Sequence, residues 1–200
     1  MSIITQAESY VFPLLEEHCG KYPYHNPDHT RTVRKRALFL AEQAGIGDEE
    51  KEDLELATLF HDIGFIKQYD KNEHLGAKIA REWLTSKNHP EARIQRIEKI
   101  IMATVLFSEP HTILEEIIQD SDLENLGQTV EFRFSTNYLH ELRTIAKNEI
   151  SDAKFWSFVK KLLSKYHFHT AKAQEENKAQ KEKNLALVNA YFNAMGYTEE

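Results

Sequence analysis

The sequence predicts an all-α protein, and three observations lead to this prediction. The chain of 200 residues contains only seven glycines and five prolines, so few positions favour a break in a helix. Leucine, alanine, glutamate and lysine, which all favour helices, are abundant. Apolar residues recur at spacings of three and four instead of alternating. We therefore expect a single-domain bundle of about eight or nine helices.

The first two helices are predicted from periodicity and from end signals. The first covers about residues 4–19. The second begins after Asn26, because asparagine is a favoured N-cap and Pro27 suits the first helical position. Asp28 adds a negative charge where the helix dipole favours one. This helix is expected to continue to Gly45.

Four further helices are expected before residue 128. The third begins at Asp48 and contains the stretch "DLELATLFHDIG". Asn72 is expected to cap the fourth, and Pro90 to start the fifth. The sixth contains "DSDLENLG" and is expected to end near Gly127, since glycine commonly follows a helix.

The C-terminal part is expected to add helices that pack on this core. Ser151 is a candidate N-cap for one of them, and a long charged helix follows near the end of the chain. Residues 128–138 leave three alternatives open, namely a strand, a loop or a helix start. In this interpretation residues 1–200 form one domain, with a core at about 22–127 and the later helices at about 138–196.

Composition excludes several classes of function. Twenty-five basic and 32 acidic residues give a net charge of −7, which argues against binding a long nucleic acid but leaves room for a small phosphorylated ligand. Cys19 is the single cysteine, so an internal disulfide and a cysteine-rich zinc site are excluded. The N-terminal stretch lacks the pattern of a secretory signal, and no apolar run suits a membrane span. We expect a cytoplasmic protein, and a homo-oligomer stays open.

Three predicted helices each place a metal-binding side chain on an inward face. His29 heads an apolar row in the second helix, which consists of Val33, Ala37, Leu40 and Ala44. His61 lies in line with Leu54 and Ala57, and Asp62 follows it directly. Asp122 lies in line with Leu114 and Ile118. Each of these polar residues is therefore expected to point toward the core.

The chemistry of this set favours a divalent metal. Two imidazoles, of His29 and His61, and two carboxylates, of Asp62 and Asp122, form a mixed nitrogen and oxygen set that suits a first-row ion. Carboxylates are costly to bury without a partner, and a bound cation offsets that cost.

The order of these motifs resembles the HD-domain superfamily of metal-dependent phosphohydrolases. Its pattern H…HD…D corresponds to His29, the pair His61 and Asp62, and Asp122, over about residues 22–127. The resemblance implies an all-α bundle and a divalent ion held by these four residues, which could be Mn, Mg, Co, Ni, Fe or Zn. It further implies hydrolysis of a phosphate ester or anhydride bond in a small, nucleotide-like substrate, with Asp62 also serving catalysis.

A second element, "YHN" before the metal histidine, resembles cyclic-nucleotide phosphodiesterases. That resemblance implies that His25 protonates the leaving group. Asn26 and Pro27 favour an extended entry into the helix, so His25 is expected just outside it. The sequence departs from its relatives at Phe65, where phosphodiesterases often have a histidine and nucleotidase-like members a glutamate.

Lys67 and His74 complete the candidate site. Lys67 follows the HD pair and is a candidate catalytic residue that neutralises phosphate oxygens. One of Arg31 and Arg34 could also lie over the pocket. His74 is a candidate second-metal ligand or phosphate contact. Two other functions stay open, a di-iron oxygenase, which needs His74, and a non-catalytic nucleotide-binding or regulatory module.

Overall fold

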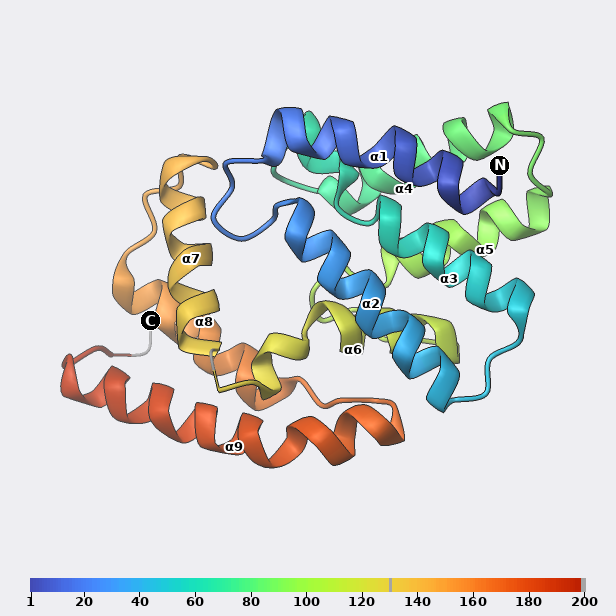
Figure 1. Cartoon of the computed structure of the whole chain (residues 1–200). Coiled ribbons are helices and arrows are strands. Elements are labelled where there is room, and N and C mark those ends of the chain that lie inside the picture. Colours follow the sequence, from blue (N-terminus) through green and yellow to red (C-terminus); the bar gives the residue numbers. More distant parts are fainter. Residues whose placement is uncertain (130, 199–200) are drawn as a thin grey trace. The chain divides into compact units, whose positions relative to one another are not determined.

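The structure is a computed structural model that describes residues 1–129 and 131–198. Over these residues the chain forms nine α-helices and two short 3₁₀-helices, with no strand (Figure 1). The predicted all-α class is therefore confirmed. The chain divides into two compact units, Met1–Asp122 and Leu123–Glu200. The expectation that all residues form one domain stays a prediction.

Unit 1 contains the first six α-helices and one 3₁₀-helix. They are α1 (Ile3–Cys19), α2 (Pro27–Gln43), α3 (Asp48–Phe60), η1 (Ile63–Ile66), α4 (Asn72–Ser86), α5 (Glu91–Met102) and α6 (Ile113–Asp122). Helix α2 packs against α3 and α6, and α4 packs against α5 and η1. The three predicted ligand-bearing helices are thus neighbours within one unit.

The start of α2 follows the predicted capping pattern. The Asn26 side-chain oxygen accepts hydrogen bonds from the backbone N–H groups of Asp28 and His29, at 3.0 and 3.1 Å. Its amide nitrogen donates to the carbonyl oxygen of Tyr22 at 3.0 Å. Asn26 therefore fixes both the first turn of the helix and the segment before it, which contains His25.

Two glycines allow α4 to lie directly on the turn that follows α3. A Cβ atom at Gly64 would lie 2.0 Å from the backbone oxygen of Asn72, and one at Gly76 would lie 2.9 Å from the backbone oxygen of Phe60. Only glycine permits these approaches without a shift of backbone. Asn72 is the first residue of α4 and not its cap, since Lys71 holds the cap position with a φ of 57°.

The predicted inward faces form the core of unit 1. Val33, Ala37 and Leu40 are buried on α2, as are Leu54 and Ala57 on α3 and Leu114 and Ile118 on α6. Ala44 is exposed, because α2 ends at Gln43 and the row turns to Ala41 instead. Each row leads to one of the candidate ligands.

Unit 2 contains η2 (Glu124–Gly127), α7 (Glu131–Thr144), α8 (Asp152–Lys165) and α9 (Ala171–Ala194). The Ser151 hydroxyl accepts from the backbone N–H of Lys154, so the predicted cap of α8 is confirmed. Of the alternatives for residues 128–138, a helix start is the one observed, with position 130 outside the described residues. Asn184 on α9 donates to the carbonyl oxygens of Leu126 and Gln128, which ties η2 to this helix.

Among the described residues, no helix combines the length and the apolar character that crossing a membrane requires.

Candidate metal centre

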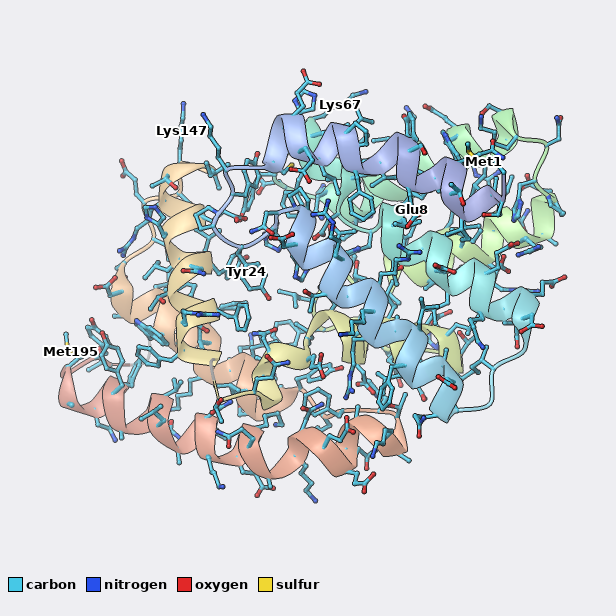
Figure 2. The ribbon with its side chains drawn as sticks, viewed as in Figure 1. Met1, Glu8, Tyr24, Lys67, Lys147 and Met195 are labelled. Carbon is cyan, nitrogen blue, oxygen red and sulfur yellow. The ribbon has the colours of Figure 1, made fainter. Side chains whose placement is uncertain are left out.

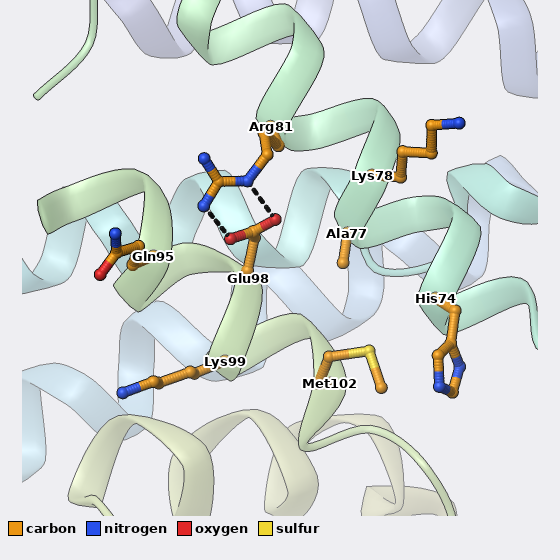
Figure 3. Close-up of a pocket in the computed structure, with 8 residues that line it drawn as sticks. All are labelled: His74, Ala77, Lys78, Arg81, Gln95, Glu98, Lys99 and Met102. Carbon is orange, nitrogen blue, oxygen red and sulfur yellow. Dashed lines mark hydrogen bonds and ion pairs between the residues drawn. The ribbon is translucent and has the colours of Figure 1, made fainter. Parts of the chain in front are cut away.

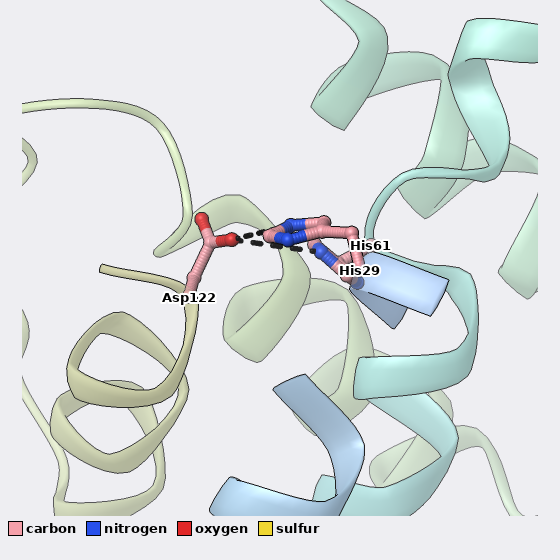
Figure 4. A group of neighbouring side chains, drawn as sticks. All are labelled: His29, His61 and Asp122. Atoms are coloured by element: carbon pink, nitrogen blue, oxygen red, sulfur yellow. Dashed lines mark hydrogen bonds and ion pairs between the residues drawn. The ribbon is translucent and has the colours of Figure 1, made fainter. Parts of the chain in front are cut away.

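The ends of α2, α3 and α6 bring three side chains together. One ligand atom from each of His29, His61 and Asp122 lies within 4.8 Å of the other two (Figure 4). The Nε2 atom of His29 lies 3.0 Å from Oδ1 of Asp122, and the Nε2 atom of His61 lies 3.8 Å from the same oxygen. Both imidazoles thus present Nε2 to one carboxylate.

Asp62 adds a second carboxylate to the group. Its Oδ2 atom lies 3.4 Å from Nε2 of His29 and 3.2 Å from Nε2 of His61. Ligand atoms that share one first-row ion at about 2.0–2.2 Å lie roughly 3.0–3.5 Å apart. Both carboxylates therefore face the two imidazole nitrogens, a donor set that suits a single divalent ion, and we call these four residues the metal cluster.

The orientation of His61 is fixed by the backbone of its own helix. Its Nδ1 atom lies 2.7 Å from the carbonyl oxygen of Thr58, so Nδ1–H donates there and Nε2 faces the carboxylates. Hydrogen bonding of the second ring nitrogen is the usual way in which proteins orient a ligand histidine. Thr58 was not among the residues predicted from the sequence, because its contribution comes from the backbone.

Two buried atoms of the metal cluster make no hydrogen bond to a described residue. They are Nε2 of His61 and Oδ2 of Asp62, whose side chains are 1% and 10% exposed. Such atoms are costly unless a partner satisfies them. The two atoms face each other 3.2 Å apart as an ion pair without a hydrogen bond, and a cation between them would satisfy both, so the residues present fit a divalent metal.

The cluster has a closed side and an open side. His61 is almost fully buried, whereas the side chains of His29 and Asp122 are 12% and 19% exposed. The part of the cluster nearest to solvent is therefore formed by His29 and Asp122. Catalytic metal sites keep such an open position for water or substrate.

The cluster perturbs its own titration. Burial lowers the pKa of His61, but the carboxylates of Asp62 and Asp122 outweigh it and raise the pKa to about 9. Burial raises the pKa of Asp62, but the charges of His61, His25 and His29 outweigh it and hold the pKa well below its usual range. Without metal, His61 is thus protonated and Asp62 ionised at neutral pH.

Metal binding is expected to strengthen as the pH rises. The ion needs a neutral His61. At any pH below the His61 pKa of about 9, the ion must therefore displace a proton. Because Asp62 stays ionised, the apparent affinity should rise by roughly tenfold per pH unit, and about 100-fold from pH 6 to pH 8. Calorimetric titration with Zn²⁺ in two buffers of different ionisation enthalpy measures both the affinity and the released proton.

A matched control for this titration is His111→Gln. His111 is exposed, and no contact among the described residues joins it to the metal cluster. This variant should show the same dependence on pH as the unmodified chain. An affinity that is constant between pH 6 and pH 8 would contradict the expected proton competition.

His25 lies just outside α2 and beside the metal cluster. Its ring centroid is 5.7 Å from that of His29, at an interplanar angle of 86°. Its ring stacks on Phe65 at 4.4 Å. Tyr24, which lies in the loop between α1 and α2 (Figure 2), meets the His25 ring edge-on. The predicted position of His25 agrees with this geometry, whereas the stacking was not predicted. The sequence held one signal for this stacking, namely an aromatic residue at Phe65, where relatives often have a histidine or a glutamate.

Two other predicted side chains are not joined to the metal cluster by any described contact. Lys67 is exposed (Figure 2) and lines a groove with residues of α1 and α4, among them Tyr10 and Trp83. His74 is exposed and lines a groove between α4 and α5 beside Met102 (Figure 3). Their roles as phosphate contact and second-metal ligand stay predictions.

The two arginines near His29 bind carboxylates elsewhere. Arg31 forms ion pairs with Glu16 and Asp28. Arg34 forms ion pairs with Glu8 and Glu55, which join α2 to α1 and α3. Both guanidinium groups therefore have structural partners.

Comparison with known proteins identifies the family of this site. The model of the HD domain matches residues 28–125, which span the whole metal cluster. No match was found among the curated proteins.

Two crystal structures resemble the chain along almost its whole length. The Lin1889 protein from Listeria innocua is 20% identical, with a TM-score of 0.62, over 98% of this chain and 97% of its own. A protein from Lactobacillus plantarum is 18% identical, with a TM-score of 0.65, over 96% of this chain and 94% of its own. At these identities the similarity shows a shared fold.

Proposed function

Since the chain belongs to the HD-domain superfamily, we propose that it is a metal-dependent phosphohydrolase. In this proposal it cleaves a phosphate ester or anhydride bond of a small, nucleotide-like substrate. The observation that carries the proposal is the pair of buried atoms, Nε2 of His61 and Oδ2 of Asp62, which lack a hydrogen-bond partner in the described part of the chain. They converge with His29 and Asp122 on one point that suits a divalent ion.

The four residues of the metal cluster would hold the ion in defined roles. His61 is oriented by Thr58 and supplies Nε2 from the buried side. His29 and Asp122 supply a nitrogen and an oxygen from the open side. When bound, a divalent ion lowers the pKa of water toward neutrality and polarises a phosphoryl oxygen.

His25 would serve the leaving group. As the bond between phosphorus and the leaving oxygen breaks, this oxygen gains negative charge and needs a proton. The imidazolium of His25 can give its proton to that oxygen, since the ring lies beside the metal cluster. The hydroxide that attacks phosphorus comes from water, whose other proton goes to solvent.

We expect His25→Ala to lower turnover by about 10²- to 10⁴-fold, the usual range for loss of a general acid. The metal content should stay unchanged, because His25 lies outside the four residues of the metal cluster, with its ring centroid 5.7 Å from that of His29. Steady-state kinetics and elemental analysis of the same preparation check both halves of this prediction. Unchanged turnover would rule out the acid role.

The experiment that tests the proposed function is a screen of phosphorylated metabolites. Nucleoside monophosphates, nucleoside triphosphates and cyclic nucleotides are assayed for loss of substrate and for the phosphate, nucleoside or nucleotide formed, with Mn²⁺, Mg²⁺, Co²⁺, Ni²⁺, Fe²⁺ and Zn²⁺. Several ions are needed because affinity for divalent metals follows a general order that does not reveal the working metal. Asp62→Ala serves as the inactive control. Absence of hydrolysis with every ion would refute the proposal.

The two alternative functions give different results in the same experiments. A di-iron oxygenase needs further ligands such as His74, and anaerobic metal analysis that finds one ion per chain would exclude it. A non-catalytic module would be stabilised by a nucleotide without turning it over under any ion.

A further inference from the structure

Aromatic rings surround the imidazole of His25. The ring of Phe65 stacks on it with centroids 4.4 Å apart and an interplanar angle of 29°. Tyr24 meets it edge-on at 4.7 Å and 78°, and Tyr69 does so at 6.3 Å and 82°. Phe65 and Tyr69 also contact each other, at 5.0 Å and 62°. We call Phe65, Tyr69 and Tyr24 the His25 cage.

The main wall of this cage is fixed to the metal cluster through the backbone. Phe65 is 6% exposed and lies three residues after Asp62 in η1, where its N–H donates to the Asp62 carbonyl oxygen at 3.1 Å. The same turn packs directly against α4, because Gly64 lies close to the backbone of Asn72. The backbone of Phe65 therefore cannot move far without moving Asp62.

The backbone of His25 is fixed from the other side. The side chain of Asn26 binds both the start of α2 and the carbonyl oxygen of Tyr22, and its backbone N–H donates to the Tyr24 carbonyl oxygen at 3.0 Å. The segment before α2 is thus folded back on itself around His25. The stacked ring of Phe65 limits rotation of the imidazole about its side-chain bonds.

We infer that Phe65 and Tyr69 are positioning residues that hold the His25 imidazole in the orientation needed to give a proton to the leaving oxygen. This inference rests on the proposed function. A flat ring can pack anywhere in a core, but here it covers one face of His25, which lies beside the metal cluster and outside its four residues. A displacement of about 1 Å in a reacting group can cost on the order of 10²-fold in rate.

The distinguishing experiment uses two substrates that differ in their need for an acid. A p-nitrophenyl phosphate ester has a leaving group that departs without a proton, whereas a nucleoside or alkyl phosphate ester needs one. Phe65→Leu keeps an apolar side chain but removes the flat ring. We expect it to lower kcat about ten- to 100-fold for the alkyl or nucleoside ester, with little change in KM, in metal content or in turnover of the p-nitrophenyl ester.

Conservative variants supply the matched controls. Phe65→Tyr and Tyr69→Phe keep the rings and should keep kcat for the alkyl or nucleoside ester within about threefold, whereas Tyr69→Leu should show a weaker form of the Phe65→Leu defect. The Tyr69 pair tests the inference even if Phe65→Leu fails to fold. Equal losses on both substrates, or loss of metal, would assign Phe65 a structural role and overturn the inference.

An NMR measurement separates the cage from the proposed function. In the metal-free protein, the ring current of Phe65 should shift the C–H signals of the His25 imidazole upfield, and Phe65→Leu should return them to ordinary positions. This measurement needs no turnover. An inactive protein that still shows the shifted signals would refute the proposed hydrolase function but support the arrangement of the rings around His25. If the wild-type protein is active but Phe65→Leu matches it on both substrates, the positioning role is refuted and the hydrolase stands.

Discussion

Replacing Asp62 by asparagine is expected to abolish metal binding and, with it, metal-dependent hydrolysis. The substitution keeps the shape of the side chain but removes one of the two negative charges that face the site. With two neutral imidazoles and one carboxylate, one positive charge of a divalent cation stays uncompensated. A buried uncompensated charge is costly, so the ion should bind poorly. Elemental analysis and kinetics under the metal that best supports the wild type measure this loss.

Thermal unfolding gives a second readout that does not depend on activity. An ion at about 100 times its Kd stabilises the folded state by about 2.7 kcal/mol, which is roughly 5–10 °C in Tm for a chain of this size. The wild type should show this increase and Asp62→Asn should not. Asp70→Asn is the matched control, because Asp70 is exposed and follows the same turn. A variant at position 62 that still gains stability from the ion would contradict the assigned role of Asp62.

Replacing Gly64 by alanine is expected to destabilise the folded protein strongly. The new Cβ atom would lie 2.0 Å from the backbone oxygen of Asn72 and 2.7 Å from its carbonyl carbon. Because the obstruction is backbone, no side-chain rotation relieves it, and η1 must move away from α4. We expect a loss of about 2–4 kcal/mol in the free energy of unfolding, seen as a decrease in Tm of about 5–15 °C.

The same substitution should also weaken metal binding, because Asp62 and Gly64 lie in one tight turn. Gly47→Ala provides the control: Gly47 has a φ of −69°, and a Cβ atom there meets nothing within 4 Å. Its Tm should fall by only about 2–4 °C, since glycine is preferred over alanine at an N-cap by on the order of 1 kcal/mol. If Gly64→Ala were as stable as Gly47→Ala, the close packing of η1 on α4 would not be essential.

Much of the fold of this protein follows from local sequence. Asn26 and Ser151 cap helices as predicted, because capping depends on one side chain and the three residues after it. The inward faces of α2, α3 and α6 are also as predicted, since a period of 3.6 residues decides which side chains share a face. Residues 128–138 were ambiguous because aromatic and β-branched residues favour strands, and α7 shows that packing overrides this preference.

Helical periodicity states toward which side a residue points, but not which helix faces it or at what distance. His29, His61, Asp62 and Asp122 could be recognised as one set, yet their separations of 3.0–3.8 Å come from how α2, α3 and α6 pack. The same packing places Lys67 and His74 in other grooves and puts the ring of Phe65 against His25. Local patterns thus determine the helices and the identity of the candidate ligands, whereas contacts between residues distant in sequence determine which atoms meet, because those contacts depend on the shape of every side chain between the helices.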